Sequence, residues 1–287
     1  MRYERPETSA AAAALLAGAQ DSAFVLAGGT DLLVRMQNDD FEAELVVDIK
    51  AIDGMTEIAE TSDAFEIGAG VSCAALGENQ ALVAAWPGVV EAANLIGSTQ
   101  IQGRCTMSGN LCNASPAADS VPALVAAAAR ARVAGPDGSR MVAVEDVPVA
   151  PGKTSLSKGE FIEAIVLDKP APRSGDAYLR FTPRTEMDIA VVGVGLSLVL
   201  DDGGTVQSAR VALGAVGPKV MLVEAAAQTI VGTKLEDGAL DALAAACSEA
   251  STPIDDKRGT VDFRKDVAGV LAKRAARIAY TRAGGAA

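Results

Sequence analysis

The sequence contains no histidine among its 287 residues, and aromatic side chains make up only 3% of it. Without histidine the chain cannot form a Ser-His-Asp or Cys-His nucleophilic site, a histidine-ligated zinc site or a covalent cofactor link through histidine. Long apolar runs are also missing, since residues 121–129 are alanine-rich and fall far short of the ~20 residues that span a bilayer. The N-terminus lacks the apolar core and cleavage pattern of a secretory signal, so we expect a cytoplasmic protein without a membrane span.

Cysteine is scarce, with Cys73, Cys105, Cys112 and Cys247 as its four occurrences. In a chain of this size they indicate free thiols in a reducing compartment rather than a disulfide framework. The spacing of Cys105 and Cys112 matches neither the CxxC pairs of zinc sites nor the clustered thiolates of iron–sulfur sites, so we expect no bound metal. A net charge of −12 argues against nucleic acid as a partner, because phosphate backbones are bound by clustered Lys and Arg.

The hydrophobic content of 49% is enough for two domains. A run of helix breakers at residues 170–175 predicts a boundary near residue 175. Beyond it, two strands flank a turn at 201–204 and are followed by helices, which predicts an α+β C-terminal domain. The helices expected along the chain are 8–19, 73–82, 87–96, one opening at 119, 222–231, 240–250 and 263–282, and the expected strands are 22–26, 45–49, 65–72 with its turn, 132–134, 141–144, 190–200 and 208–214.

Two glycine-bearing segments stand out in the first half of the chain, Ala27-Gly28-Gly29-Thr30-Asp31 and Thr106-Met107-Ser108-Gly109-Asn110. Glycine permits a positive φ and lets backbone N–H groups come within hydrogen-bond distance of an anionic oxygen. After the first segment, residues 31–36 suit a helix whose unpaired N–H groups could face the same anion. We interpret the two segments together as a clamp for a pyrophosphate, although either one alone would more simply be a tight turn between a strand and a helix.

Other phosphate-binding signatures are weak or missing. Gly68-Ala69-Gly70 supplies part of a dinucleotide fingerprint, but Cys73 stands where the third glycine would be needed, which favours a strand end followed by a helix cap. The sequence has no GxxxxGK[ST] motif and therefore does not fit a P-loop nucleotide hydrolase.

Several stretches resemble the FAD-binding medium subunit of the molybdenum hydroxylases, a family that includes the carbon monoxide dehydrogenase medium chain and the flavin domain of xanthine dehydrogenase. In the first half they are residues 27–32 (AGGTDL), 96–111 (IGSTQIQGRCTMSGNL) and 114–119 (ASPAAD). Residues 184–190 (RTEMDIA) and 255–259 (DDKRG) are similar to the family's C-terminal domain. The likeness runs in the same order through nearly the whole chain.

The resemblance implies an α+β fold with FAD bound noncovalently. A vanillyl-alcohol-oxidase-like (PCMH-type) FAD-binding domain would occupy residues 1–175, with subdomains of about 1–55 and 56–175. A C-terminal domain of the carbon monoxide dehydrogenase flavoprotein type, with a sheet packed against helices, would occupy residues 176–287. The cofactor would lie between these parts.

The resemblance also implies which residues hold FAD. Backbone N–H groups of residues 27–31 and the Thr30 hydroxyl would hold one side of the pyrophosphate, and the second glycine-bearing segment the other. Two polar residues would lie near the adenosine half, one apolar residue would contact the cofactor, and Arg180 would stabilise negative charge near N1 of the reduced isoalloxazine. The full set is Ala27, Gly28, Gly29, Thr30, Asp31, Leu32, Thr106, Ser108, Gly109 and Asn110, then Ser115 and Asp119 for adenosine, Ile162 for the apolar contact, and Arg180. We expect Gly28→Val to crowd the pyrophosphate and abolish flavin retention while leaving much of the fold intact.

The sequence departs from the family pattern at two of these positions. Ser108 replaces the first glycine of the family's TxGGN loop, which restricts the backbone there but offers a small hydroxyl that could donate to a phosphate. Arg180 replaces a family lysine, which keeps the charge and changes the hydrogen-bond geometry.

Simpler roles also fit some of the singled-out residues. Asp119 could be only a helix N-cap, and Arg180 could be a solvent-facing strand residue. Asp255, Asp256 and Arg258 are best interpreted as a structural charge cluster where a helix begins.

The function that the resemblance implies is electron transfer as one subunit of a molybdenum hydroxylase. Electrons would come from [2Fe-2S] clusters on a small subunit, pass through FAD and leave to NAD⁺ or another acceptor, while a molybdenum-cofactor large subunit oxidises the substrate; the assembly would be a dimer of heterotrimers. Such a role needs no protein nucleophile. A stand-alone flavin oxidase or reductase of the same fold superfamily, and a nucleotide-sensing protein that binds no flavin, remain alternatives.

Overall fold

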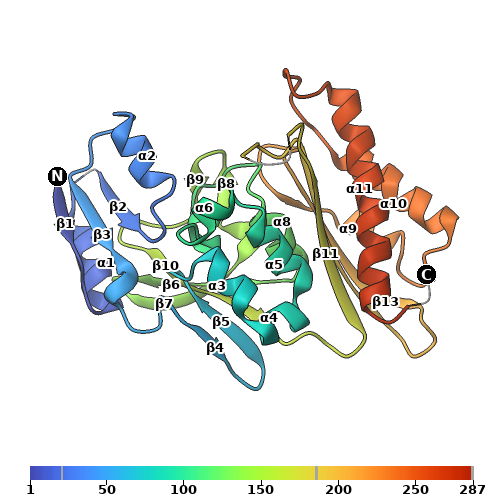
Figure 1. Ribbon diagram of the computed structural model, residues 1–287, viewed down its shortest axis with the longest axis horizontal. Coiled ribbons are helices and arrows are strands. Elements are labelled where there is room, and N and C mark those ends of the chain that lie inside the picture. Colours follow the sequence, from blue (N-terminus) through green and yellow to red (C-terminus); the bar gives the residue numbers. More distant parts are fainter. Residues whose placement is uncertain (21, 185–186, 286–287) are drawn as a thin grey trace.

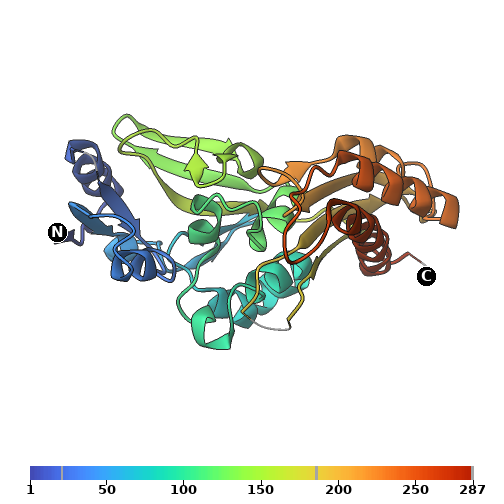
Figure 2. The ribbon, with the colours of Figure 1, turned by 90° about the horizontal axis from the view of Figure 1, so that it is seen from above.

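The computed structural model of the protein describes residues 1–20, 22–184 and 187–285. Within these residues the sheets follow one another along the long axis of the molecule, from the N-terminus at one end to the C-terminal helices at the other (Figure 1). The view from above shows the same order, with the second sheet lying between the N-terminal part and the C-terminal helices (Figure 2). In this part of the chain no helix is both long enough and apolar enough to cross a bilayer.

The first sheet is parallel, with strand order β1–β3–β2. Helix α1 follows an N-cap in which the Thr8 hydroxyl accepts a hydrogen bond from the Ala11 N–H, and its alanine-rich sequence has high helix propensity. Ala12, Ala13 and Leu16 are the buried face of this helix. The elements are β1 (Arg2–Glu4), α1 (Ser9–Gly18), β2 (Ala23–Leu26), α2 (Leu32–Gln37), β3 (Leu45–Asp48) and a 3₁₀ turn at Ile49–Ala51.

The second sheet is antiparallel, with strand order β4–β5–β10–β6–β7. Its core is made of buried aliphatic and aromatic side chains such as Phe65 and Phe161, and the same hydrophobic cluster extends to α1 and β3. The strands are β4 (Ile58–Glu60), β5 (Ala64–Gly68), β6 (Arg130–Gly135), β7 (Gly138–Ala143) and β10 (Phe161–Asp168), with a 3₁₀ turn at Val144–Asp146 and a small hairpin of β8 (Pro148–Ala150) and β9 (Lys153–Thr154) between β7 and β10.

Short helices connect β5 to β6 and carry the second glycine-bearing segment. They are α3 (Cys73–Glu78), α4 (Gln80–Ala85), α5 (Pro87–Asn94), α6 (Thr99–Gln102), α7 (Met107–Cys112) and α8 (Ser120–Ala126). Helix α8 is buried along its whole length, which fits its position between the second and third sheets (Figure 1).

The third sheet is antiparallel, with strand order β11–β12–β13–β14. Helices α10 and α11 cover one side of it (Figure 1). Helices α5 and α8, which precede the sheet in the sequence, pack against its strands. The sheet is therefore the surface through which the two halves of the chain meet. Its elements are β11 (Ser174–Phe181), β12 (Val192–Leu200), β13 (Val206–Gly214), β14 (Met221–Leu222), α9 (Glu224–Gln228), α10 (Asp237–Ala250) and α11 (Val261–Arg282).

The helix expected over residues 73–82 is interrupted in the structure. Asn79 has an extended backbone conformation, and its side-chain oxygen accepts a hydrogen bond from the Leu82 N–H, so it ends α3 and begins α4. Asparagine is a strong N-cap residue because its side chain competes for backbone N–H groups, which explains the break. The helix expected over 222–231 is likewise shorter, at Glu224–Gln228.

Two long strands were not among the sequence expectations. Strand β10 pairs with β5 on one side and β6 on the other, and β11 begins at Ser174, inside the run of helix breakers. Breakers mark where a helix cannot continue, but they do not prevent a strand from starting. The expected hairpin after residue 190 is present as β12 and β13.

Candidate functional site

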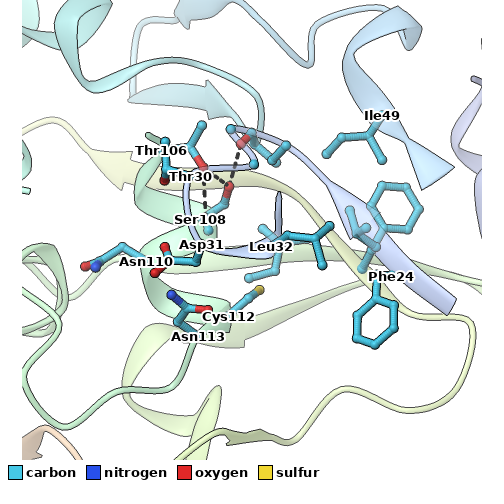
Figure 3. A pocket seen from close by; sticks show the side chains of 18 of the residues that line it. Phe24, Thr30, Asp31, Leu32, Ile49, Thr106, Ser108, Asn110, Cys112 and Asn113 are labelled. Carbon is cyan, nitrogen blue, oxygen red and sulfur yellow. Dashed lines mark hydrogen bonds between the residues drawn. The ribbon is translucent and has the colours of Figure 1, made fainter. Parts of the chain in front are cut away.

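A cavity of about 390 Å³ lies between the loop that follows β2, the beginning of α7 and strand β10. It is lined by most of the residues predicted from the sequence, which come from both glycine-bearing segments and from β10 (Figure 3). These residues are Ala27, Gly28, Gly29, Thr30, Asp31, Leu32, Thr106, Ser108, Gly109, Asn110 and Ile162. The other predicted residues, Ser115, Asp119 and Arg180, are not part of its lining.

At Gly28 the first glycine-bearing segment touches the backbone that leads directly into the second one. A Cβ atom added to Gly28 would overlap the carbonyl oxygen of Arg104 and lie 3.1 Å from the Cα of Cys105. Only glycine allows such a close approach of two backbones. Gly29 adopts a φ of +78°, a left-handed conformation that also favours glycine. The sequence expectation of converging backbones therefore matches the geometry, but Gly28 faces the neighbouring segment, so its substitution would disturb the fold and not only a ligand.

The first segment carries a row of unused backbone donors. Within the described part of the chain, the N–H groups of residues 28–32 donate no hydrogen bond, and the α2 helix bonds begin with the Leu33 N–H to the Gly29 carbonyl at 3.0 Å. The Ala27 carbonyl accepts from Nζ of Lys50 at 2.9 Å, and because the peptide is trans, the Gly28 N–H points the opposite way. Successive free N–H groups of this kind form an anion-binding concavity.

Lys50 holds this loop from outside the cavity. Its Nζ lies 2.6 Å from Oδ1 of Asp48 and also contacts the Leu26 carbonyl at 3.4 Å. The pKa of Asp48 lies below its ordinary value, because hydrogen bonds from Lys50 and Tyr3 outweigh the opposing effect of burial. The loop is therefore fixed at its carbonyl side, which leaves the N–H side free.

The second segment differs from the turn that the sequence suggested. It is the start of helix α7, and the Thr106 hydroxyl is the N-cap, accepting a hydrogen bond from the Gly109 N–H at 3.0 Å. Gly109 is thus a helical residue, and no positive φ occurs there. In the described part of the chain, the N–H groups of residues 106–108 donate no hydrogen bond, as is usual for the first residues of a helix.

The Ser108 hydroxyl is already used within the protein. It is buried, donates to the Ala69 carbonyl at 2.5 Å and lies 3.2 Å from the Thr106 hydroxyl (Figure 3). The expectation that this hydroxyl donates to a phosphate does not fit, because its one proton is taken. Instead, the hydroxyl that replaces a family glycine anchors α7 to the turn after β5.

Asn110 ties α7 to the beginning of α8. Its Oδ1 accepts from the Ser120 N–H at 3.1 Å and from the Ser120 hydroxyl at 2.7 Å. These two donors identify the oxygen end of the amide. The Nδ2 group, at the cavity, is consequently the end of Asn110 that can donate to a ligand.

Asp119 and Arg180 form a buried ion pair with Tyr178, away from the cavity lining. Arg180 Nη1 donates to Asp119 Oδ2 at 2.6 Å, and the Tyr178 hydroxyl donates to Oδ1 at 3.0 Å. Burial raises the pKa of Asp119 above its ordinary value, and Arg180 opposes that shift. Burial, followed by the charge of Asp119, raises the pKa of Tyr178 far above its usual range.

This ion pair changes several expectations. Asp119 makes no side-chain cap bond, so it is not a conventional N-cap, and the Arg180 side chain is only 7% exposed, so it does not face solvent. The sequence analysis assigned Asp119 to the adenosine half of FAD and Arg180 to the isoalloxazine half. A separation of 2.6 Å is incompatible with both roles at once. Tyr178 was missed, although alternate strand residues share a face and would have paired it with Arg180.

Ser115 and the C-terminal motifs have local structural partners. The Ser115 hydroxyl accepts from the Ala117 N–H at 3.2 Å in the connection between α7 and α8. The Asp256 carboxylate accepts hydrogen bonds from the Arg258 N–H and from the Arg264 side chain, the latter at 2.6 Å, and both bonds lower its pKa. This fits the expected structural charge cluster. Of the motif at 184–190, Thr185 and Glu186 lie outside the described residues.

The opposite end of the cavity is apolar and was not anticipated from the sequence. Phe24 and Ile49 lie there (Figure 3). Ala23, Val25 and Phe161 are further apolar residues of the cavity lining. Phe24 belongs to the half-buried strand β2, and Ile49 follows the buried strand β3. Apolar residues in and beside strands carry no separate signal for a ligand. The position of β2 directly before the glycine-bearing loop could have indicated Phe24, because the side chains of that strand lie next to the loop.

The charge of the cavity wall also constrains the ligand. Among the described lining residues, Arg35 is the only cation, and Asp31 and Glu160 are the acids. Arg140 donates to Glu160 at 2.7 and 2.8 Å and holds the pKa of that carboxyl at about 2. An anion in this cavity would therefore depend on backbone N–H groups more than on cationic side chains.

Comparison with known sequences identifies related proteins over nearly the whole chain. The family described as FAD binding domain in molybdopterin dehydrogenase matches residues 1–170, and the CO dehydrogenase flavoprotein C-terminal domain matches residues 177–279. The chain is 33% identical over 282 residues to the carbon monoxide dehydrogenase medium chain of Afipia carboxidovorans, covering 98% of this chain and 97% of that protein. It is 28% identical over 285 residues to the putative xanthine dehydrogenase FAD-binding subunit of Escherichia coli K12, covering 99% and 97%.

Solved structures show the same likeness in three dimensions. A chain of the reconstituted CO dehydrogenase from Oligotropha carboxidovorans superposes with a TM-score of 0.93 at 31% identity, and the match covers 98% of each chain. The arrangement of sheets and helices described above is therefore shared over its full length.

Proposed function

This chain belongs to the family of FAD-binding domains in molybdopterin dehydrogenases, and on that premise we propose that it is the electron-transfer subunit of a molybdenum-containing hydroxylase. The family and the α+β fold predicted from the sequence, with an FAD-binding part and a C-terminal domain, are confirmed. The chain is a subunit of an oxidoreductase, and its cofactor is FAD.

The observation that carries the proposal for the site is the set of unused backbone donors at the cavity. The free N–H groups of residues 28–32 and 106–108 come from two segments that are brought together by the contact of Gly28 with Arg104, just before the second segment. A diphosphate is a doubly anionic group that accepts several hydrogen bonds at once. Because the described lining contains a single cation, most of the donors available to it are backbone N–H groups. We propose that these N–H groups and Nδ2 of Asn110 hold the FAD diphosphate.

The chain itself supplies binding and orientation. Bound FAD accepts electrons one at a time and passes on two, which is chemistry that belongs to the cofactor. Consistent with this division, the sequence has no histidine to act as a general base. The Lys50 contacts keep the first loop rigid, and Thr106 and Ser108 fix the second segment, so both sets of donors are preorganised.

We propose that the electrons come from [2Fe-2S] clusters of a small subunit and leave to NAD⁺ or another acceptor. A large subunit with the molybdenum cofactor would oxidise the substrate, and the assembly would be a dimer of heterotrimers in the cytoplasm. The support is that the similar proteins are named as the medium chain or the FAD-binding subunit of a dehydrogenase.

We also propose that the chain divides into domains near residue 175. Buried residues form one hydrophobic cluster that is mostly before this point and another that begins at Ala177. Strand β11 contributes side chains to both clusters, because Ala177 belongs to the second cluster and Tyr178 to the first. In this proposal the ion pair of Asp119 and Arg180 links the domains. Any effect of Arg180 on the isoalloxazine is then an effect of the ion pair, because Asp119 neutralises the charge of Arg180.

The purified chain tests the proposal. We expect it to bind one FAD tightly, to release it on acid denaturation because the link is noncovalent, and to oxidise no organic substrate by itself. A chain that stays colourless after reconstitution with FAD would refute the proposal. Turnover without partners would instead favour a stand-alone flavin oxidase or reductase, and copurification with a large and a small subunit, weighed as an intact complex, would exclude that alternative.

A further inference from the structure

The apolar end of the cavity contains an ordered aromatic stack. The Phe24 and Phe41 rings lie with their centroids 4.2 Å apart and their planes at 27°, and the Arg35 guanidinium carbon lies 4.9 Å from the Phe41 centroid. Phe24 and Arg35 both line the cavity. Phe24 and Ile49 lie at one end of the site, and Thr106 and Asn110 lie at the other (Figure 3).

The stack holds the Phe24 ring in a fixed orientation. Offset stacking with Phe41 restricts the ring, and the guanidinium group of Arg35 adds a cation–π contact on Phe41. Arg35 also lies 3.8 Å from Asp40, in an ion pair whose two side chains are about half exposed. A rigid aromatic face at the wall of an apolar chamber suits a flat heteroaromatic ring, which can stack on it.

FAD has two flat ring systems, on opposite sides of its diphosphate. The isoalloxazine must exchange electrons with other chains, so it needs a position open to them. Phe24 lies on β2 and Ile49 directly follows β3, so the apolar end is built within the first 170 residues, and Ile49 belongs to the buried core of the first two sheets. The adenine exchanges no electrons and loses nothing by being enclosed there.

We propose that Phe24 is the platform on which the adenine of FAD stacks, and that Phe41 and Arg35 are positioning residues for that platform. The inference rests on the proposed function, since it takes FAD as the ligand. It replaces Ser115 and Asp119, neither of which lines the cavity, as the residues assigned to the adenosine half. It also places the isoalloxazine on the other side of the diphosphate, away from Phe24.

Ligand fragments test the proposal, because ADP contains the adenine and FMN contains the isoalloxazine. The affinities of FAD, ADP and FMN would be measured by titration calorimetry for the wild-type chain, Phe24→Ala and Phe24→Trp. Stacking of a base on an aromatic side chain predicts that Phe24→Ala weakens FAD and ADP roughly 5- to 150-fold and leaves FMN unchanged. Phe24→Trp should restore most of the affinity.

Two further variants separate stacking from folding. Phe24→Leu keeps apolar volume without an aromatic face, so its affinity for ADP should fall with that of Phe24→Ala although its melting temperature stays near the wild-type value. Phe263→Ala is the matched control, because Phe263 forms an aromatic pair with Phe181, centroids 5.5 Å apart, in the C-terminal half. It should leave the affinity for ADP unchanged.

The outcomes distinguish this inference from the proposed function. If Phe24→Ala weakens FMN and not ADP, or changes neither, the adenine platform is wrong while FAD binding stands. If the wild-type chain binds ADP through Phe24 but does not bind FAD, the proposed function is wrong and the platform stands. A wild-type chain that binds none of the three ligands would overturn both.

Discussion

The cavity and the contact between β11 and its neighbouring helices treat polar groups in opposite ways. At the cavity, the N–H groups of residues 28–32 have no partner within the described chain. At the β11 contact, Asp119 is paired with Arg180 and Tyr178, and Asp176 accepts from the Val89 N–H at 3.1 Å. Polar groups left unused by the fold mark the place where a ligand belongs, whereas those used by the fold hold its parts together.

Gly28→Val is expected to have the largest effect on FAD binding, because it affects the cavity and its supporting contact together. Its side chain would overlap the Arg104 carbonyl and push the two segments apart. We expect loss of FAD retention and a destabilisation of about 1–3 kcal/mol, in place of the intact fold that the sequence alone suggested. Flavin content after gel filtration and chemical unfolding measure the two effects.

Gly103→Ala is the matched control in the same neighbourhood. Apart from its own neighbours in the sequence, no described residue has an atom within 4 Å of the Cβ it would add, and the backbone of Gly103 is helical. Normal flavin content is expected in this variant. Full flavin content in Gly28→Val as well would contradict the account of the touching segments.

Asp119→Ala tests the opposite side of the comparison. It leaves the buried Arg180 guanidinium without its partner, which should cost about 3–5 kcal/mol in the free energy of unfolding. The double variant Asp119→Leu with Arg180→Met removes both charges and should recover most of that loss. A single variant as stable as the wild type would show that the ion pair does not hold the two halves of the chain together.

The pH dependence of the free energy of unfolding tests the same contact at Asp176. Burial raises the pKa of Asp176 to about 6 from its ordinary value of 3.8, and its Oδ1 has no hydrogen-bond partner among the described residues. The folded chain therefore holds the proton more tightly than the unfolded chain. The contribution of this group to stability is complete below pH ~4 and is lost as the pH rises through about 6, a change of about 3 kcal/mol.

Asp176→Asn should remove that part of the pH dependence, because the amide keeps an oxygen for the Val89 N–H and cannot ionise. Relative to the wild type, the variant should gain stability between about pH 5 and about pH 7. Urea unfolding at both values measures the difference. Parallel stability profiles for the two proteins would be inconsistent with a raised pKa.

Thr106→Val is expected to have the smallest effect. It removes the oxygen that accepts the Gly109 N–H, and loss of such a cap costs about 1 kcal/mol. FAD affinity should fall severalfold as the start of α7 loosens, whereas Thr106→Ser should behave like the wild type. Thermal melting and FAD titration of the two variants check this, and equal values for both would argue against the cap.

The sequence was sufficient for the fold class, the hairpin after residue 190 and the pairing of the two glycine-bearing segments. It could not show that Thr106 to Asn110 begins a helix, because Ser and Gly within a short segment fit a turn or a helix equally well. It also missed the Tyr178 contact and the Phe24 stack, since both depend on which strands and loops become neighbours. Local patterns place Tyr178 on the same strand face as Arg180 and Phe24 beside the glycine-bearing loop, but they do not reveal the partners Asp119 and Phe41.

Amide hydrogen exchange of the chain with and without FAD tests the central claim most directly. N–H groups that donate no hydrogen bond exchange rapidly, and a bound diphosphate would slow them. We predict that FAD protects residues 28–32 and 106–108, and that riboflavin, which has no phosphate, does not. Protection by FAD confined to other parts of the chain would contradict the proposal that these backbone groups hold the diphosphate.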